Sequence, residues 1–415
     1  MQPARNIMKK FFFLFKILLA TLLLLWVFSK AHWSDYVTTN NQAGAKSYSL
    51  AANQDLTNSN ISTYVVKEGV LWWAKNIELQ KSDLEPVKNT GIFVRKGVLS
   101  CVQNMNITML IAAFLFYLVG ITSITLRYNG LLKAQGIDIP FMKLYRLSFL
   151  GLFYSSIIPG SIGGDLVKAY YVNKHTEKTA EVLMSTFIDR FAGLVGFTLM
   201  SFITLAIALA LELASIQQLK IAILAVLVAT GLSAAILLLI LSGKFRKFLR
   251  LERIYNKTSV AHHFAAAGNS TKIYRERPSV LAKAFGFTAI NQIFVISSCA
   301  FIGFSIGLNI PFWSYYLYTP LIFIISAIPV TPGGVGVTEN LYVKFFSIAA
   351  IGTVAPDVSM ILVLAMFARL IPILWGIPGL WVVATGHKVP KSDIMQAELD
   401  VKEMNEEFRT RTLEK

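Results

Sequence analysis

Long apolar segments dominate the sequence from Ile107 onward and restrict what this chain can fold into. The stretch "ITMLIAAFLFYLVGITSITL" (107–126) is uncharged, and about 20 such residues are what an α-helix needs to cross the hydrocarbon core of a bilayer. Only helices and closed barrels satisfy their backbone hydrogen bonds in lipid. The sequence therefore predicts an all-α polytopic membrane protein.

The charge content supports this class. Charged residues make up 15% of the chain and hydrophobic residues 55%, whereas soluble domains have about 25% charged residues. The net charge of +16 comes from bases in short stretches between apolar runs, which is typical of cytoplasmic loops rather than of a nucleic-acid-binding surface. Cys101 and Cys299 lie far apart and no metal-binding motif is present, so we expect no disulfide, metal or cofactor.

We expect about six full transmembrane helices. The first, in residues 1–30, is interpreted as an uncleaved span because no signal-peptidase site closes its apolar region. Residues 31–106 then form a small extracytoplasmic insertion, in which "STYVVKEGVLWW" and "TGIFVRKGVL" can form strands. The membrane domain follows in 107–387, and 388–415 is a cytoplasmic tail. The other five spans are predicted at 107–126, 180–211, 221–241, 284–308 and 360–383.

A proline- and glycine-rich break interrupts the apolar segment 147–165, within "SSIIPGSIGGDLVKAYYV" (155–172). Bases lie on both sides of this segment, at Arg127, Lys133, Lys143 and Arg146 before it and at 168–178 after it. Both flanks are therefore assigned to the cytoplasm. A segment that enters and leaves on the same side, with Pro159 at its break, is predicted to be a re-entrant hairpin.

A second break of the same kind occurs in "YTPLIFIISAIPVTPGGVGVTENLYVKFF" (318–346), at Pro332. This segment starts from an outer loop, so the two hairpins are predicted to enter from opposite sides of the membrane. Interrupted apolar segments at corresponding positions in two halves of a chain are typical of inverted-repeat transporters, and they mark the binding site.

Two arginines within apolar segments are the first candidate binding residues. Arg190 and Arg369 both lie inside predicted spans, where an arginine costs about 2.5–3.5 kcal/mol and usually faces a cavity or a partner. A guanidinium bonds two phosphate oxygens at once. The glycines of the breaks add free backbone N–H groups at helix starts, which also suit an anion. These glycines are Gly163, Gly164, Gly333, Gly334 and Gly336.

Four carboxylates accompany the arginines: Asp165, Glu339, Asp189 and Glu181. They are candidates for gating or proton coupling. Asp165 and Glu339 can instead serve only as helix caps, and the charges can form a structural ion-pair network. Asp189 is a poor partner for its neighbour Arg190, because adjacent helical residues do not face each other. Glu181, Ser185 and Asp189 recur every fourth residue and predict one inward polar stripe.

Four motifs in order resemble the flippase-like family, also called the lysylphosphatidylglycerol synthase transmembrane-region family. They are "FYSSIIPGSIGGDLVKAY" (153–170), "STFIDRFAGLVG" (185–196), "AIPVTPGGVGVTE" (327–339) and "ARLIPILWGIPGL" (368–380). The resemblance covers 107–387 and implies an inner-membrane protein with re-entrant elements that moves lipid-linked molecules between leaflets. Asp165, Arg190, Glu339 and Arg369, with the prolines and glycines of both breaks, match the motif positions.

The chain departs from the family pattern in two respects. The polar insertion at 35–105 separates the first two spans, where a short loop is expected. The tail 388–415 has no room for the aminoacyl-transferring domain of the full-length synthases. Lysyl transfer is therefore not expected.

The sequence favours a lipid flippase that moves an anionic head group through a cavity formed by the two hairpins. We expect it in the inner membrane of a bacterial-type cell, with both termini cytoplasmic, and with an anionic phospholipid or a polyprenyl-phosphate-linked molecule as substrate. Alternatives are a lipid-binding scaffold for a partner enzyme, held through 31–106, and a transporter of a soluble anion. A homo-oligomer formed through 31–106 is also open. An enzyme using Asp165 and Glu339 as acid and base is the least favoured, and no catalytic residue is assigned.

Overall fold

The computed structural model describes the sheet of the insertion and most of the helical region. The first predicted span and the tail 388–415 lie largely or entirely outside the described residues. Those residues are 18, 21–23, 31–39, 47–50, 63–68, 75–84, 94–157, 163–176, 178–241, 274, 277–328, 330–331, 334–348 and 357–385.

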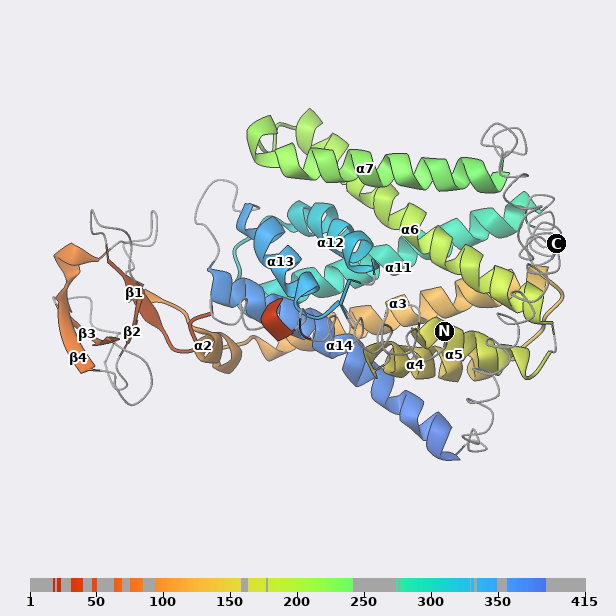
Figure 1. The fold of residues 1–415 in the computed structure, drawn as a ribbon, viewed down its shortest axis with the longest axis horizontal. Coiled ribbons are helices and arrows are strands. Elements are labelled where there is room, and N and C mark those ends of the chain that lie inside the picture. The colour runs from red at the N-terminus through yellow and green to blue at the C-terminus, as the bar shows by residue number, and fades with distance from the viewer. Residues whose placement is uncertain are drawn as a thin grey trace, which may run out of the picture. The chain divides into compact units, whose positions relative to one another are not determined.

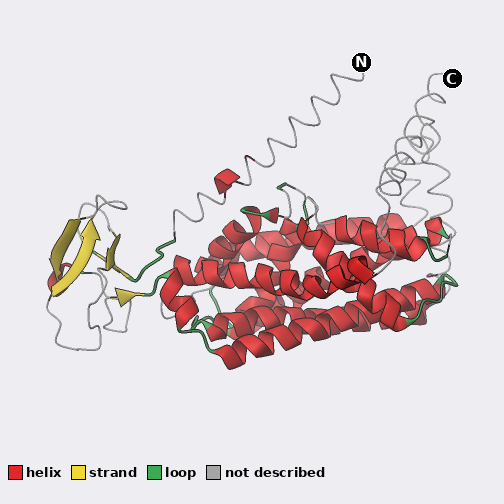
Figure 2. Ribbon diagram, turned by 90° about the horizontal axis from the view of Figure 1, so that it is seen from below, coloured by secondary structure: helices red, strands yellow, loops and turns green. Residues whose placement is uncertain are grey.

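The insertion contains a five-stranded antiparallel sheet in the order β4-β3-β2-β1-β5 (Figure 2, yellow). Two of its strands fall in the segments predicted from sequence. The other three were not predicted, since short strands in polar surroundings give weak periodicity. Val37, Leu50, Tyr64, Val66 and Leu84 form its core. The strands are β1 (Tyr36–Thr38), β2 (Ser47–Leu50), β3 (Thr63–Glu68), β4 (Lys75–Gln80) and β5 (Val94–Arg95), followed by the short helix α2 (Val98–Gln103).

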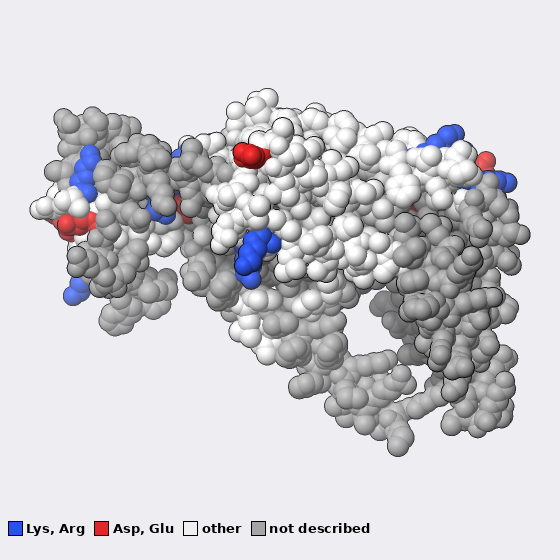
Figure 3. All heavy atoms as spheres, turned by 90° about the horizontal axis from the view of Figure 1, so that it is seen from above, with Lys and Arg blue, Asp and Glu red and all other residues white. Residues whose placement is uncertain are grey.

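Five of the described helices are long and apolar enough to cross a membrane, and they coincide with five of the six predicted spans. Large apolar side chains are exposed on them, for example Leu224, Leu227 and Val228 of α7, as lipid-facing positions require. In Figure 3 the described helical surface is mostly uncharged. These helices are α3 (Ile107–Ala134), α6 (Thr179–Ala210), α7 (Ile216–Leu241), α11 (Pro278–Ser305) and α14 (Val358–Thr385).

Four shorter helices flank the two glycine-rich breaks. α4 (Phe141–Ile157) and α5 (Gly163–Asn173) lie on either side of the first break and pack against each other, as do α12 (Phe312–Ser326) and α13 (Val337–Ile348) at the second (Figure 1). None of the four is among the helices long enough to span. The two predicted interruptions are therefore confirmed as helix breaks.

The helices repeat in order and length along the chain. A 28-residue helix, two short helices and a long helix occur first as α3 to α6 and again as α11 to α14. The short helices of the first set have 17 and 11 residues, and those of the second set have 15 and 12. This repeat of elements supports the internal symmetry inferred from the two breaks.

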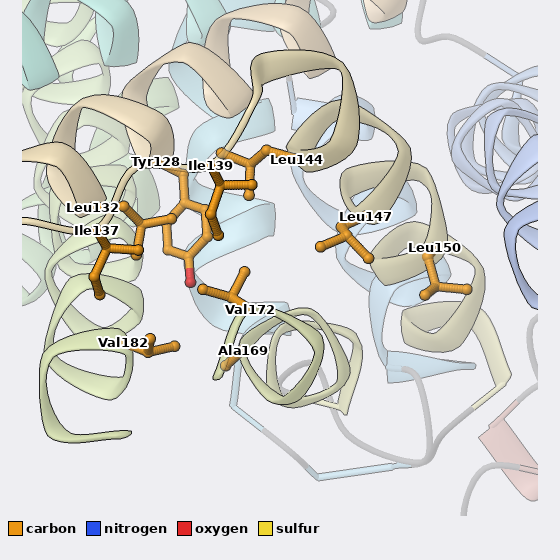
Figure 4. Close-up of a cluster of buried hydrophobic side chains, with 10 residues drawn as sticks. All are labelled: Tyr128, Leu132, Ile137, Ile139, Leu144, Leu147, Leu150, Ala169, Val172 and Val182. Atoms are coloured by element: carbon orange, nitrogen blue, oxygen red, sulfur yellow. The ribbon is translucent and has the colours of Figure 1, made fainter. Parts of the chain in front are cut away.

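The chain divides into two compact units. One contains the sheet, α12 and α13, and its aromatic core joins Tyr315 of α12 to Phe346 of α13, with ring centroids 5.1 Å apart. The other contains α4 and α5, packed with parts of α3 and α6 around Tyr128 (Figure 4). The long helices contribute residues to both units.

The sheet is attached to the start of α14 within the first unit. The Tyr36 hydroxyl of β1 donates a 2.7 Å hydrogen bond to Asp357 Oδ1, and the same oxygen accepts the backbone N–H of Ser359. His32 stacks on Tyr36 and donates its backbone N–H to Ser359 Oγ. Burial raises the pKa of Asp357, while the hydrogen bond from Tyr36 opposes that shift. Tyr36 thus stabilises a carboxylate that burial disfavours.

The attachment should be pH-dependent. Because its pKa is raised in the folded protein, Asp357 stabilises the attachment most fully below the ordinary aspartate pKa of about 4, and less as pH rises through the raised value. Tyr36→Phe removes a hydrogen bond to a charged group, worth about 1.5–3 kcal/mol, so it should loosen β1 and the first turn of α14 far more at pH 7 than at pH values below the ordinary aspartate pKa of about 4. Hydrogen exchange, corrected for its intrinsic pH dependence, measures this.

Two variants control this experiment. Tyr48→Phe removes a hydroxyl from the neighbouring strand and should change little. Asp357→Asn should remove the part of the pH dependence that comes from Asp357 and leave the part that comes from His32, whose pKa burial lowers. Equal exchange in wild type and Tyr36→Phe at both pH values would show that the hydrogen bond does not hold the sheet.

Candidate functional site: arginine–carboxylate pairs on the membrane helices

The first break places Asp165 in the opening turn of a helix packed tightly on its neighbour. Gly164 lies against Gly151 of α4 so closely that a Cβ there would collide with the Gly151 carbonyl and with Ser155 Oγ. Glycine at 164 is therefore required for α5 to approach α4. Asp165 is the third residue of α5, after Gly163. Pro159 lies outside the described residues.

Asp165 forms an ion pair with Arg190 of α6 through Oδ2 and Nε. Arg190 follows the start of α6 by eleven residues, or roughly 16 Å along the axis. Its side chain remains 47% exposed although paired, and that of Asp165 is 23% exposed. The Arg190 side chain therefore lies well inside an apolar helix and still keeps part of its surface exposed.

The second break depends on glycine for its backbone shape. Gly334 and Gly336 have φ angles of +67° and +80°, a left-handed conformation that side chains with a Cβ rarely adopt. The Gly334 N–H donates to the Thr331 carbonyl at 3.1 Å, and the Gly336 N–H donates to Glu339 Oε2 at 2.7 Å. Pro332 and Gly333 lie outside the described residues.

Glu339 uses its other oxygen for an ion pair. Oε1 accepts a 2.8 Å hydrogen bond from Arg369 Nε of α14. The Glu339 side chain is 6% exposed and that of Arg369 is 28% exposed. Glu339 therefore caps its own helix and pairs with an arginine. Since Asp165 is also paired, capping is not the sole role of either residue.

The two ion pairs occupy equivalent places in the two helix sets. Asp165 is the third residue of α5 and Glu339 the third of α13. Arg190 and Arg369 each follow the start of the next long helix by eleven residues. The sequence singled out all four side chains, and the structure joins them as one pair in each set.

A third pair was not predicted. Arg127 of α3 donates to Asp189 Oδ1 through Nε at 2.7 Å and to Thr288 Oγ1 of α11 through Nη1 at 2.9 Å. The arginine and aspartate side chains are 2% and 9% exposed. Arg127 had been grouped with the cytoplasmic bases, which is wrong, because α3 continues to Ala134 and carries it inside the bundle. Asp189 faces away from Arg190, as helix geometry requires.

Lys168 was also predicted to lie in a basic loop, and the structure places it in a helix instead. It lies in α5, is buried, and its ammonium sits 3.8 Å from the centroid of the Tyr128 ring, a cation–π contact. The continued periodicity of "DLVKAYYV" as a helix is the signal that could have placed it inside.

The polar stripe predicted on α6 is partly buried. Ser185 and Asp189 are buried, and Ser185 Oγ lies 2.9 Å from the Tyr274 hydroxyl. Glu181 is half-buried in the first turn of α6, where the helix dipole favours a carboxylate. Of the predicted carboxylates, Asp189 thus joins a closed network, whereas Asp165 and Glu339 hold the two accessible arginines.

The Arg127–Asp189 pair should be structural. Arg127→Gln leaves the Asp189 charge buried without its partner, which typically destabilises a protein by about 3–5 kcal/mol. The thermal midpoint in detergent should fall markedly, and the double variant Arg127→Met, Asp189→Leu should recover most of the loss. Lys133→Gln is the matched control, because Lys133 and Asp138 form an exposed pair of the kind worth about 0–1 kcal/mol. A wild-type midpoint for Arg127→Gln would contradict this role.

Together, five candidate spans, two broken helices and arginines paired inside apolar helices define a multi-pass helical membrane protein. The family model of the lysylphosphatidylglycerol synthase transmembrane region matches residues 93–381. The chain belongs to this family. Strands β1 to β4 precede the matched region.

Two archaeal relatives are similar over much of their length. A UPF0104 membrane protein of Pyrococcus horikoshii is 24% identical over 305 residues, which cover 67% of this chain and 82% of the relative. A UPF0104 membrane protein of Methanothermobacter thermautotrophicus is 24% identical over 247 residues, covering 55% and 70%. Their names describe membrane proteins and state no substrate.

Proposed function

We propose that this protein moves an anionic membrane lipid, or a lipid-linked anion, between leaflets, with Arg190 and Arg369 binding the head-group phosphate. The observation that carries the proposal is the 47% exposure of the Arg190 side chain at a deep position in α6. An intramembrane arginine normally faces a cavity, water or a partner rather than hydrocarbon. In this proposal, a head group that enters from the lipid binds this side chain.

Asp165 and Glu339 act as exchangeable partners in this proposal. Each holds its arginine through Nε, so an arriving phosphate competes with a carboxylate for the same guanidinium. Phosphate can compete because the planar fork of arginine binds two of its oxygens, as it binds two oxygens of a carboxylate. Protonation of the carboxylate would also release the arginine, which offers a route for proton coupling.

The order of the helices supports access to the transporter from both leaflets. If both broken segments are re-entrant, α3, α6 and α7 are the crossings that precede α11 in the described part of the chain. This odd number makes the second helix set run opposite to the first. The helix sets that carry the two ion pairs would then have opposite orientations in the membrane, as in inverted-repeat transporters. The matched family region is the transmembrane part of a synthase, and lysyl transfer is not part of the proposal.

The test is transport in liposomes containing the purified full chain. Wild type should move fluorescent phosphatidylglycerol between leaflets, and Arg190→Ala and Arg369→Ala should each lower the rate about 100-fold, because the phosphate loses its charged partner. Arg190→Lys should recover only part of the rate, since lysine keeps the charge but not the fork. Arg146→Ala removes an exposed arginine of α4 and is the matched control.

Two further arms separate the alternatives. Phosphatidylcholine should move more slowly than phosphatidylglycerol, and entrapped glycerol phosphate should not be released; release of that anion would favour a soluble-solute transporter. Folded Arg190→Ala and Arg369→Ala proteins that transport at the wild-type rate would overturn the proposal.

The second candidate is a lipid-binding scaffold for a partner enzyme, favoured by the sheet. β4 is an edge strand in which residues at both ends are exposed, and such an edge can pair with a strand of another protein. Absence of lipid movement by wild type, together with an enzyme that co-purifies only when β4 is intact, would favour this function.

A further inference from the structure

A basic pocket lies between the last turns of α3 and the first turns of α11, and its lining includes none of Asp165, Arg190, Glu339 and Arg369. Its volume is about 290 Å³. Arg127 and Lys133 line it from α3, and Arg277 and Lys283 line it from the start of α11. The flippase proposal does not use this pocket.

The lining of this pocket contains no carboxylate among the described residues. Arg127 is neutralised by Asp189, and Lys133 is 3.5 Å from the exposed Asp138. Arg277 and Lys283 are both exposed, and neither makes an ion pair with any residue that the structure describes. The pocket therefore keeps a positive charge that an anion would compensate.

Polarity changes along the pocket from the helix ends inward. On α11, Arg277 precedes the helix, Lys283 follows, and Phe287 lies one turn deeper on the same face. On α3, Gly130 lies one turn deeper than Lys133 and leaves open space, because a Cβ there would meet nothing within 4 Å. Arg127 lies deeper still on α3, but Asp189 neutralises it. The bases without an ion pair therefore lie at the mouth and Phe287 lies further in, which matches a molecule with a charged head and an apolar tail.

We propose that this pocket binds one anionic phospholipid, with its phosphate at Arg277 and Lys283 and the start of an acyl chain along Phe287. Both walls belong to helices that are candidate membrane spans, so a lipid beside these helices is the ligand that the proposal assigns to the pocket. Basic pockets between transmembrane helices are known to bind anionic head groups. Free phosphate would leave the apolar wall unused. The site is distinct from the transport pairs, and its occupancy does not require transport.

Photo-crosslinking locates such a lipid directly. The purified full chain is incubated with phosphatidylglycerol or phosphatidylcholine carrying a photoreactive acyl chain, and the labelled peptides are identified by mass spectrometry. We expect phosphatidylglycerol to label the peptides containing residues 126–134 and 277–287. Excess unlabelled phosphatidylglycerol should compete, and inorganic phosphate should not.

Three variants sharpen the test. Arg277→Gln with Lys283→Gln should lower the labelling about 30-fold, the ratio expected for two bases beside an anionic lipid. Gly130→Leu should also abolish it by filling the pocket, without loss of stability, because leucine is the better helix former. Lys143→Gln with Arg146→Gln removes the same charge from exposed positions on α4 and should leave labelling unchanged.

Labelling should persist in Arg190→Ala, which separates this site from the transport function. The proposal is overturned if the Arg277/Lys283 variant labels like wild type, if phosphatidylcholine labels these peptides equally, or if inorganic phosphate competes as well as the lipid does.

Discussion

The structure depends on ion pairs that hold arginines inside apolar helices, where an unpaired arginine is costly. Arg127, Arg190 and Arg369 lie in three of the candidate spans, and each is paired with a carboxylate from a different helix. Each pair therefore fixes two helices relative to each other. The pairs differ in accessibility: Arg127 is buried completely, whereas Arg190 and Arg369 keep exposed surface. That difference separates a structural contact from two candidate binding sites.

The glycine-rich breaks provide the geometry for the accessible pairs. Gly164 allows α5 to touch α4, and the left-handed Gly334 and Gly336 turn the chain into α13. Both arrangements put a carboxylate at the third position of a short helix, ahead of an arginine in the next long helix. In the first unit the sheet is bound to Asp357 at the start of α14, the helix that carries Arg369.

Much of this arrangement was predictable because its signals are local. The length of the apolar segments predicted the spans. Proline followed by paired glycines predicted both breaks, at "PGSIGGD" and "PVTPGGVG". Arg190 and Arg369 stood out because the residues around them are apolar. The pairing could not be predicted, since it depends on how α5 meets α6 and how α13 meets α14. Arg127 and Lys168 were misplaced because bases near the end of a span look like loop residues until the helix is seen to continue. The strands β1 and β2 were too short to give a period, and β4 was missed because four of its six residues are polar.

The central claim is that Arg190 faces a polar route and not hydrocarbon, and thiol labelling in membranes tests it most directly. Arg190→Cys and Phe187→Cys lie one turn apart on α6, and Phe187 is also exposed, at 52%. The native Cys101 and Cys299 are buried. A water-soluble thiosulfonate reacts with thiolates in water, so the account predicts that Arg190→Cys reacts at least 100-fold faster than Phe187→Cys. Equally slow reaction at both positions would place Arg190 in lipid and contradict the account.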